Sequence, residues 1–127
     1  MRADCHMHTY FSGDSEAKPE DMILAAIDKG LEAICFTDHE DIDYFCDDIE
    51  FVFDPETYFK ELGALKEKYK EKLDIRIGVE FGLQPHLAKK AKAFTAANPY
   101  DFVIGSMHVV GWKDPYYPGF FEGISDE

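Results

Sequence analysis

Asp4-Cys5-His6-Met7-His8-Thr9 is the stretch that decides the fold, because it joins the pattern of a β-strand to two closely spaced histidines. Apolar and polar side chains alternate over residues 3–8, which predicts one face with Ala3, Cys5 and Met7 and an opposite face with Asp4, His6 and His8. We expect Cys5 to pack in the core. Strand residues two apart lie about 6.6 Å apart on one face. Two such imidazoles can hold one metal ion through bonds of about 2.0–2.1 Å.

Three further strand patterns follow along the chain, each preceded by a helical pattern. Strands are expected over residues 31–37, 75–81 and 102–108, and the apolar run of residues 31–37 is typical of a strand covered on both faces. Helices are expected from Pro19 to Gly30, from Pro55 after the cap Asp54, and from Pro85 to just before Asn98. Strands that alternate with helices in this way predict a parallel sheet. We therefore expect an α/β fold of about four βα units in one domain, residues 1–127.

The composition is that of a globular protein with a strong acidic excess. Of the 127 residues, 46% are hydrophobic and 15% are aromatic, which argues against disorder. The 26 acidic and 13 basic residues give a formal net charge of −13. This charge repels a phosphate backbone, so no nucleic-acid partner is expected. A phosphorylated substrate fits only where bound cations reverse the local sign of the potential.

Cysteine usage and hydropathy indicate a cytoplasmic location. Cys5, Cys35 and Cys46 form no CxxC pair and their number is odd, so a disulfide framework is not expected. The chain opens directly on a strand pattern, without a charged and then apolar leader. No apolar run approaches the roughly 20 residues of a membrane helix. We therefore expect a soluble protein without a membrane partner.

Side chains that can bind a metal stand at the end of every predicted strand. They are His6 and His8 at the first strand, His39 after the second, Glu80 near the end of the third and His108 at the fourth. The carboxyl ends of parallel strands share one rim, where α/β proteins bind their ligands. We therefore expect these residues to converge on one small volume. Asp14, in the turn after the first strand, is a further candidate ligand.

Each candidate also has a purely structural interpretation. A lone histidine is more often a hydrogen-bonded polar residue than a ligand, His-x-His arises by chance, and a turn aspartate needs no function. The recurrence at four strand ends favours metal binding over these alternatives. His86 follows Pro85 and is interpreted as part of a helix start. Phe11 and the acidic stretch from Glu40 to Glu50 can line a substrate pocket, although a solvated loop is the default expectation.

Four ordered motifs resemble those of the polymerase and histidinol phosphatase (PHP) superfamily. They are Asp4-Cys5-His6-Met7-His8-Thr9, Thr37-Asp38-His39, Gly78-Val79-Glu80-Phe81-Gly82 and Gly105-Ser106-Met107-His108. The resemblance extends over essentially the whole chain. Its nearest branch is that of the histidinol-phosphate phosphatases, with which Asp114-Pro115-Tyr116-Tyr117 is also compatible.

The resemblance implies a distorted (βα)7 TIM-like barrel, of which this chain supplies the N-terminal half. It implies up to three divalent ions, zinc, manganese or iron. His6, His8 and Glu80 would hold the first ion, Glu80 and His108 the second, and Asp14 and His39 the third. The implied reaction is hydrolysis of a phosphate monoester by metal-activated water, with histidinol phosphate as the leading substrate.

The sequence also departs from the family pattern. Family members are about twice as long, and their later strands supply a further histidine and an Asp-x-His pair that nothing here matches. A half barrel leaves sheet edges unpaired and removes the partner of the aromatic run Tyr116, Tyr117, Phe120 and Phe121. We therefore expect a homo-oligomer that forms through the open sheet edges.

Three functions remain open at this point. The first is a truncated metal-dependent phosphoesterase of the histidinol-phosphatase type, whose own turnover is in question because each metal would lack a ligand. The second is a non-catalytic metal-binding or assembly module that requires a partner chain. The third is another hydrolase or exonuclease activity on the same scaffold.

Overall fold

The computed structural model describes residues 1–45 and 51–123, in which parallel strands form one sheet with helices between them. The strands are β1 (Ala3–Met7), β2 (Ala33–Phe36), β3 (His39–Glu40), β4 (Asp74–Gly82) and β5 (Phe102–Ser106). The helices are α1 (Pro19–Asp28), α2 (Pro55–Tyr69) and α3 (Ala88–Ala97), with short 3-10 helices η1 (Pro85–Leu87) and η2 (Pro118–Phe120). Cys46 and the part of the acidic stretch within residues 46–50 lie outside the described residues.

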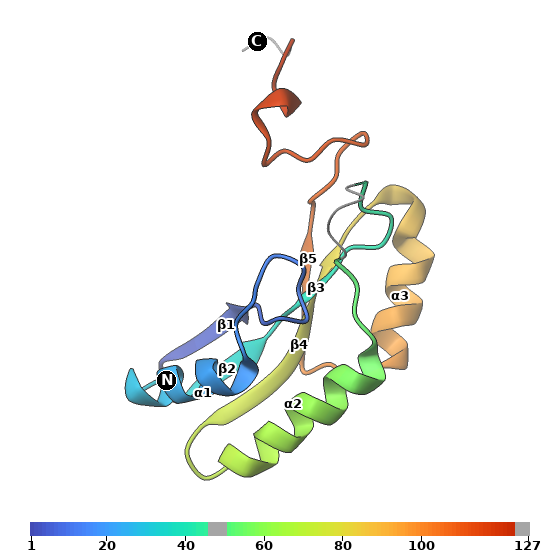
Figure 1. Ribbon diagram of the computed structural model, residues 1–127. Coiled ribbons are helices and arrows are strands. Elements are labelled where there is room, and N and C mark those ends of the chain that lie inside the picture. Colours follow the sequence, from blue (N-terminus) through green and yellow to red (C-terminus); the bar gives the residue numbers. More distant parts are fainter. Residues whose placement is uncertain (46–50, 124–127) are drawn as a thin grey trace.

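The long strand β4 lies between the other strands and sets their register. β2 and then β3 pair in parallel along one side of β4, and β5 pairs in parallel along its other side. β1 pairs in parallel with β2 at the far edge. His39 and Ile104 are consequently both register partners of Glu80. The predicted α/β arrangement of four βα units is confirmed, and all carboxyl ends of the strands lie at one rim (Figure 1).

The hydrophobic core lies between one face of the sheet and the helices. Ile34 and Phe36 of β2 and Ile75 and Ile77 of β4 point to this face. From the helices, the core receives Ile23 and Ala26 of α1 and Tyr58, Leu62 and Tyr69 of α2. Phe94 of α3 contacts Phe81 of β4, with ring centroids 5.6 Å apart. All three helices therefore cover the same face, which leaves the other face for the polar side chains of β4.

Local sequence explains where α2 begins and how α1 ends. Asp54 caps α2, since its Oδ2 accepts a hydrogen bond from the Thr57 backbone N–H at 2.9 Å, and Pro55 occupies the first helical position. The chain leaves α1 through Gly30, whose φ of 69° lies in the left-handed region that favours glycine.

The first strand departs from the simple alternation predicted for it. Asp4 pairs with Ile34 and Met7 pairs with Phe36, so a bulge separates the two positions and puts three steps of β1 opposite two of β2. Met7 packs against the core, whereas Cys5 is exposed. The prediction that Cys5 packs in the core is therefore wrong, because the bulge breaks the alternation that would put Cys5 on the same face as Met7.

The second edge of the sheet is also uncovered among the described residues. Phe102 and Val103 of β5 are 47% and 41% exposed. Residues after β5 run away from the sheet (Figure 1), and Tyr116 there is 85% exposed. In the described part of the chain, no helix has the length and apolar character needed to cross a membrane.

Replacement of a single α2 core residue should cost much of the stability. Leu62 is fully buried, so Leu62→Ala should lower the free energy of unfolding by about 2–5 kcal/mol. The matched control is Leu24→Ala in α1, where the side chain is 49% exposed and the loss should stay within about 0.5 kcal/mol. Urea titration followed by circular dichroism measures both. Equal losses for the two variants would contradict the assignment of the core.

Candidate metal centre

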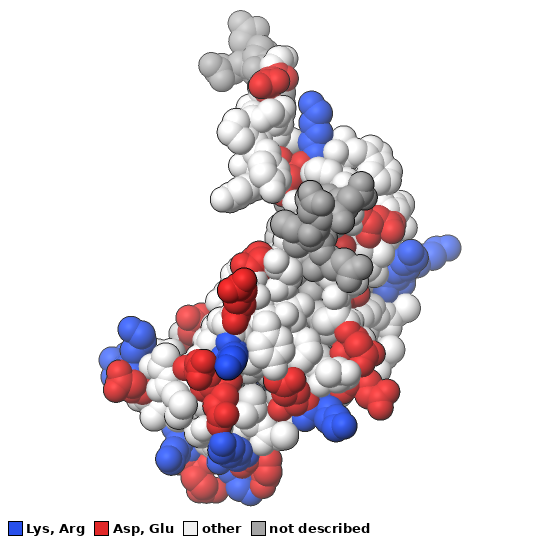
Figure 2. Space-filling model, in the orientation of Figure 1, with Lys and Arg blue, Asp and Glu red and all other residues white. Residues whose placement is uncertain are grey.

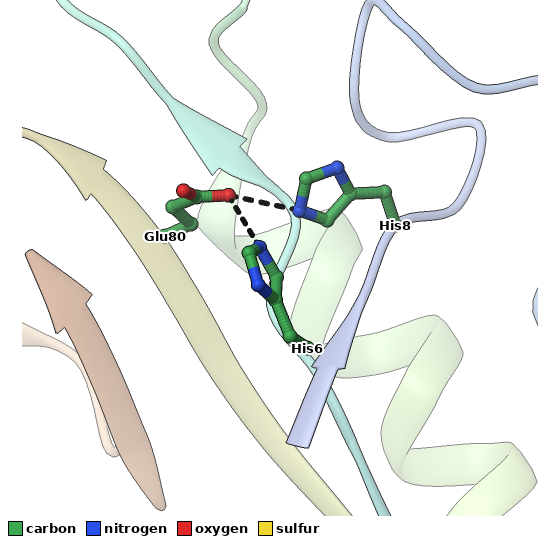
Figure 3. A group of neighbouring side chains, drawn as sticks. All are labelled: His6, His8 and Glu80. Carbon is green, nitrogen blue, oxygen red and sulfur yellow. Dashed lines mark hydrogen bonds and ion pairs between the residues drawn. The ribbon is translucent and has the colours of Figure 1, made fainter. Parts of the chain in front are cut away.

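A single buried carboxylate, Glu80, receives side chains from two segments that are far apart in the sequence. Its Oε2 lies 2.9 Å from Nε2 of His6 and 2.9 Å from Nε2 of His8 (Figure 3). Its Oε1 lies 3.1 Å from Nε2 of His108 and accepts a hydrogen bond of 2.6 Å from the Ser106 hydroxyl. β4 projects Glu80 onto the face without helices, where the ends of β1 and β5 flank it. The predicted convergence of these strand ends is observed.

Asp14 and His39 form a second group beside the first. The Oδ2 atom of Asp14 lies 3.3 Å from Nδ1 of His8 and 3.4 Å from Nε2 of His39. His8 therefore has one ring nitrogen toward Asp14 and the other toward Glu80. The turn after β1 brings Asp14 into place, and His39 stands in β3 beside Glu80 in register.

The donor atoms satisfy the geometric requirement for metal binding in three overlapping groups. In each group, the ligand atoms lie within 4.8 Å of one another. The groups are His6, His8 and Glu80; His8, Asp14 and His39; and His39, Glu80 and His108. Nε2 of His8 is buried and faces Oε2 of Glu80 at 2.9 Å. Imidazole nitrogens with carboxylate oxygens suit zinc, manganese or iron. All six predicted residues belong to these groups, and their role as ligands stays a prediction.

One buried acid, Asp41, contacts two of these histidines and was not predicted. Its Oδ2 lies 2.9 Å from Nδ1 of His39, and its Oδ1 lies 2.9 Å from Nδ1 of His108. Asp41 and its neighbour Glu40 are nearly fully buried, so the expectation of a solvated loop is wrong at these two positions. The signal in the sequence was the His-x-Asp spacing of His39 and Asp41, which puts both on one face of an extended segment.

A hydrogen-bonded cluster around Asp38 supports the two loops that carry the site. Oδ1 of Asp38 accepts hydrogen bonds from the Thr9 N–H, the Thr9 hydroxyl and the Ser12 hydroxyl, at 2.5, 3.0 and 3.1 Å. The Ser12 hydroxyl oxygen accepts from the His39 N–H at 2.8 Å. The turn after β1 is thereby tied to the segment that bears His39.

The electrostatics show a carboxylate pair surrounded by imidazoles. Burial acts to raise the pKa of Glu80, but contacts with His108, His8, Ser106 and His6 outweigh it and hold that pKa far below its usual value. The contacts with Asp41 and Glu80 raise the pKa of His108 to about 10. Burial likewise opposes ionisation of Asp41, whose pKa is nevertheless lowered by His108 and His39.

A hollow of about 400 Å³ adjoins the site. Its lining consists of Asp14, His39, Asp41, Tyr44, Phe51, His108, Asp114, Tyr116 and Tyr117. The Tyr44 hydroxyl donates a 2.6 Å hydrogen bond to Asp114 and so joins two loops of the wall. Part of the acidic stretch therefore lines a pocket. Phe11 packs on Tyr58 instead, with ring centroids 5.0 Å apart, and is absent from this lining.

His86 belongs to none of the three ligand groups found in the described residues. It lies in η1, directly before α3, which confirms its interpretation as part of a helix start. Its Nε2 lies 3.0 Å from Asp43, and its ring stacks on Trp112 at 5.9 Å.

Charges of both signs are distributed over the surface. On the face drawn in Figure 2, lysine and arginine side chains lie among acidic ones instead of forming one patch. That distribution gives no support on this face to binding of a phosphate backbone.

A family model for the PHP domain matches residues 4–126. The chain belongs to the PHP domain family. The histidinol-phosphatase of Lactococcus lactis subsp. lactis (strain IL1403) is 37% identical over 115 residues, which are 91% of this PHP chain and 42% of the relative. A Deinococcus radiodurans protein named "Probable histidinol-phosphatase" is 32% identical over 111 residues, with 85% and 42% covered. The chain therefore spans less than half the length of these relatives.

A solved structure shows the same arrangement of strands. The crystal structure of the Lactococcus lactis histidinol phosphate phosphatase, complexed with zinc, L-histidinol and phosphate, matches with a TM-score of 0.84 at 38% identity. The match covers 89% of this PHP chain and 42% of the other. It confirms the expected fold class, a parallel half-barrel like that of the histidinol phosphatase TIM-like fold.

The metal-free protein should be most stable at mildly acidic pH. The pKa of Glu80 is lowered from 4.5 in the folded chain. Ionised Glu80 therefore adds to the free energy of unfolding above pH 4.5, and this stabilisation is lost as the pH falls below that value. The pKa of His108 is raised from 6.5 to about 10 in the folded chain. Protonated His108 therefore adds its full stabilisation to the free energy of unfolding below pH 6.5, and this stabilisation is lost as the pH rises toward 10. Urea unfolding in the presence of EDTA should give the highest free energy of unfolding between pH 4.5 and pH 6.5.

The control for this pH dependence is His108→Gln, which removes one titrating group and should flatten the alkaline side of the curve. Stability that stays level or increases from pH 6.5 to 10 in the unsubstituted chain would contradict the assigned contacts of His108.

Proposed function

We propose that the chain is the metal-binding part of a divalent-metal-dependent phosphatase that hydrolyses histidinol phosphate. The observation that carries this proposal is the convergence of four histidines, Asp14 and Glu80 in three ligand groups. Two further findings support it: the relative of Lactococcus lactis is a histidinol-phosphatase, and its crystal structure contains zinc, L-histidinol and phosphate.

Each side chain has a defined part in the proposal. His6, His8 and Glu80 would hold one cation, Glu80 and His108 a second, and Asp14 and His39 a third. Bound divalent cations would supply a strong nucleophile from water at neutral pH and neutralise charge on the phosphoryl oxygens. Since one oxygen of Glu80 faces His6 and His8 and the other faces His108, its carboxylate can bridge two cations.

The hollow beside the ligand groups suits the organic part of such a substrate. Tyr44, Phe51, Tyr116 and Tyr117 provide aromatic walls, and Asp114 provides an acidic group. Aromatic faces and a carboxylate together favour a cationic group such as an amine. The negative wall would repel a phosphate, so we infer that the phosphate lies toward the cations and the amine toward Asp114.

An assembly role is the second candidate, and the unpaired edges of the sheet favour it. Among the described residues, β1 pairs with β2 alone and β5 with β4 alone. Apolar groups on β5 are half-exposed. We infer that the chain associates through these edges, either with another copy or with a chain that completes the ligand set. The thiols of Cys5 and Cys35 are free, which agrees with the reducing cytoplasm that we propose for the protein.

The direct test of the enzymatic proposal is phosphate release from histidinol phosphate in the presence of Mn²⁺ or Zn²⁺. The chain should release phosphate, and His8→Ala should reduce the rate at least about 100-fold, because His8 contacts both acids of the site. His86→Ala is the matched control and should leave the rate unchanged, since His86 belongs to no ligand group of the described residues. Metal retention without turnover would favour the assembly role, and release from a nucleic-acid 3′ end would favour a different hydrolase.

Self-association is tested by sedimentation velocity at micromolar concentration. The chain should sediment as a dimer or larger species, and Val103→Lys on the β5 edge should shift it toward monomer, because edge lysines oppose strand pairing. Leu24→Lys on exposed α1 serves as the control and should leave the distribution unchanged. A stable monomer of the unsubstituted chain would remove the homo-oligomer proposal.

A further inference from the structure

We propose that Asp41 is a positioning residue that holds the imidazoles of His39 and His108 with their Nε2 atoms toward the ligand groups, and that Gly82 is needed to leave room for it. This inference rests on the metal centre proposed above. It adds a residue that contributes no atom to any of the three ligand groups.

The contacts of Asp41 define this role. Its two carboxylate oxygens face two different imidazoles, each at the Nδ1 atom and each at 2.9 Å. The other ring nitrogen of His108 faces Glu80 at 3.1 Å, and that of His39 faces Asp14 at 3.4 Å. A carboxylate at the remote nitrogen of a metal-binding histidine fixes the tautomer and the ring orientation and makes the ring a better ligand.

Asp41 also connects two of the ligand groups. His39 belongs to the group with His8 and Asp14, and it belongs as well to the group with Glu80 and His108. The rings of His39 and His108 meet edge to face, with centroids 4.8 Å apart. Rotation of the His39 ring would therefore disturb both groups, rotation of the His108 ring would disturb the second, and the shared carboxylate restrains the two rings together.

The last residue of β4, Gly82, supplies an independent observation. A Cβ atom at this position would lie 1.7 Å from Oδ1 of Asp41 and 2.8 Å from its Cγ. Both distances are far below van der Waals contact, so any side chain at residue 82 would displace the Asp41 carboxylate. The closest approach is to the side chain of Asp41, with its Cα 3.4 Å away, which links the glycine directly to this carboxylate.

The contacts of the Asp41 side chain do not hold its own loop in place. The loop is held by other groups, because the Asp41 backbone N–H donates to the Phe51 carbonyl and the Glu40 side chain accepts from the Phe53 N–H. The Asp41 carboxylate itself faces the two imidazoles. Its loss should therefore alter the rings more than the fold of the loop.

The first arm of the experiment uses the metal-free protein and does not depend on metal binding. In ¹H–¹⁵N spectra of the imidazoles, the Nδ1 proton of His108 should be protected in the unsubstituted chain and in Gly63→Ala, because a Cβ at Gly63 has no neighbour within 4 Å. The same proton should lose its protection in Asp41→Ala and in Gly82→Ala. Unchanged spectra in both site variants would overturn the proposal.

The second arm measures zinc affinity by competition with a chelating dye. Asp41→Ala and Gly82→Ala should each weaken zinc binding about 10–100-fold, whereas Gly63→Ala should not change it. The Asp41→Ala/Gly82→Ala double variant should bind no worse than either single variant, because the added methyl group then has no carboxylate to displace. Additive losses would contradict the link between the two residues.

Asp41→Asn is the control for a variant that fails to fold, because it keeps the side-chain volume and one acceptor oxygen. It should weaken zinc binding less than Asp41→Ala does. Affinity equal to that of the unsubstituted chain in every Asp41 variant would overturn the positioning role while leaving the metal centre intact. Failure of the unsubstituted chain to bind zinc would instead reject the proposed function, and the spectra of the metal-free protein would then decide the role of Asp41 alone.

Discussion

The carboxylate of Glu80 has to stay charged although it is 3% exposed, and the site is arranged around that requirement. Removing an ion from water costs several kcal/mol unless polar or charged partners replace the water. Three imidazoles and the Ser106 hydroxyl provide that replacement here. Because β4 pairs with strands on both of its sides, the chain can bring these partners to Glu80 from segments far apart in the sequence. A cation bound between Glu80 and these imidazoles would also stabilise the buried charge of the Glu80 carboxylate.

Much of the fold could be predicted because its signals are local. The alternation of strands and helices, the proline and cap residues at Asp54 and Pro55, and the apolar run of β2 each depend on neighbouring residues. The convergence of His6, His39, Glu80 and His108 followed from one topological rule, namely that the carboxyl ends of parallel strands share a rim. Their identity as metal ligands depends on an ion that residues and spacing alone do not reveal.

The rest could not be predicted, because it depends on contacts that only the folded chain defines. The bulge in β1 follows from its pairing with β2, and it places Met7 in the core and leaves Cys5 exposed. Asp41 stands in an acidic stretch whose composition is typical of a solvated loop, yet two imidazoles enclose it. Its partner Gly82 ends one of the four sequence motifs, but only its distance to Asp41 shows why a glycine stands there.

The most direct test is anomalous diffraction at the zinc absorption edge from crystals of this chain grown with zinc. The central claim is that Glu80 and the imidazoles share cations. It predicts strong peaks about 2.0–2.2 Å from the carboxylate oxygens of Glu80 and from Nε2 of His6, His8 or His108. Zinc bound only to surface carboxylates, with no peak beside Glu80, would contradict it.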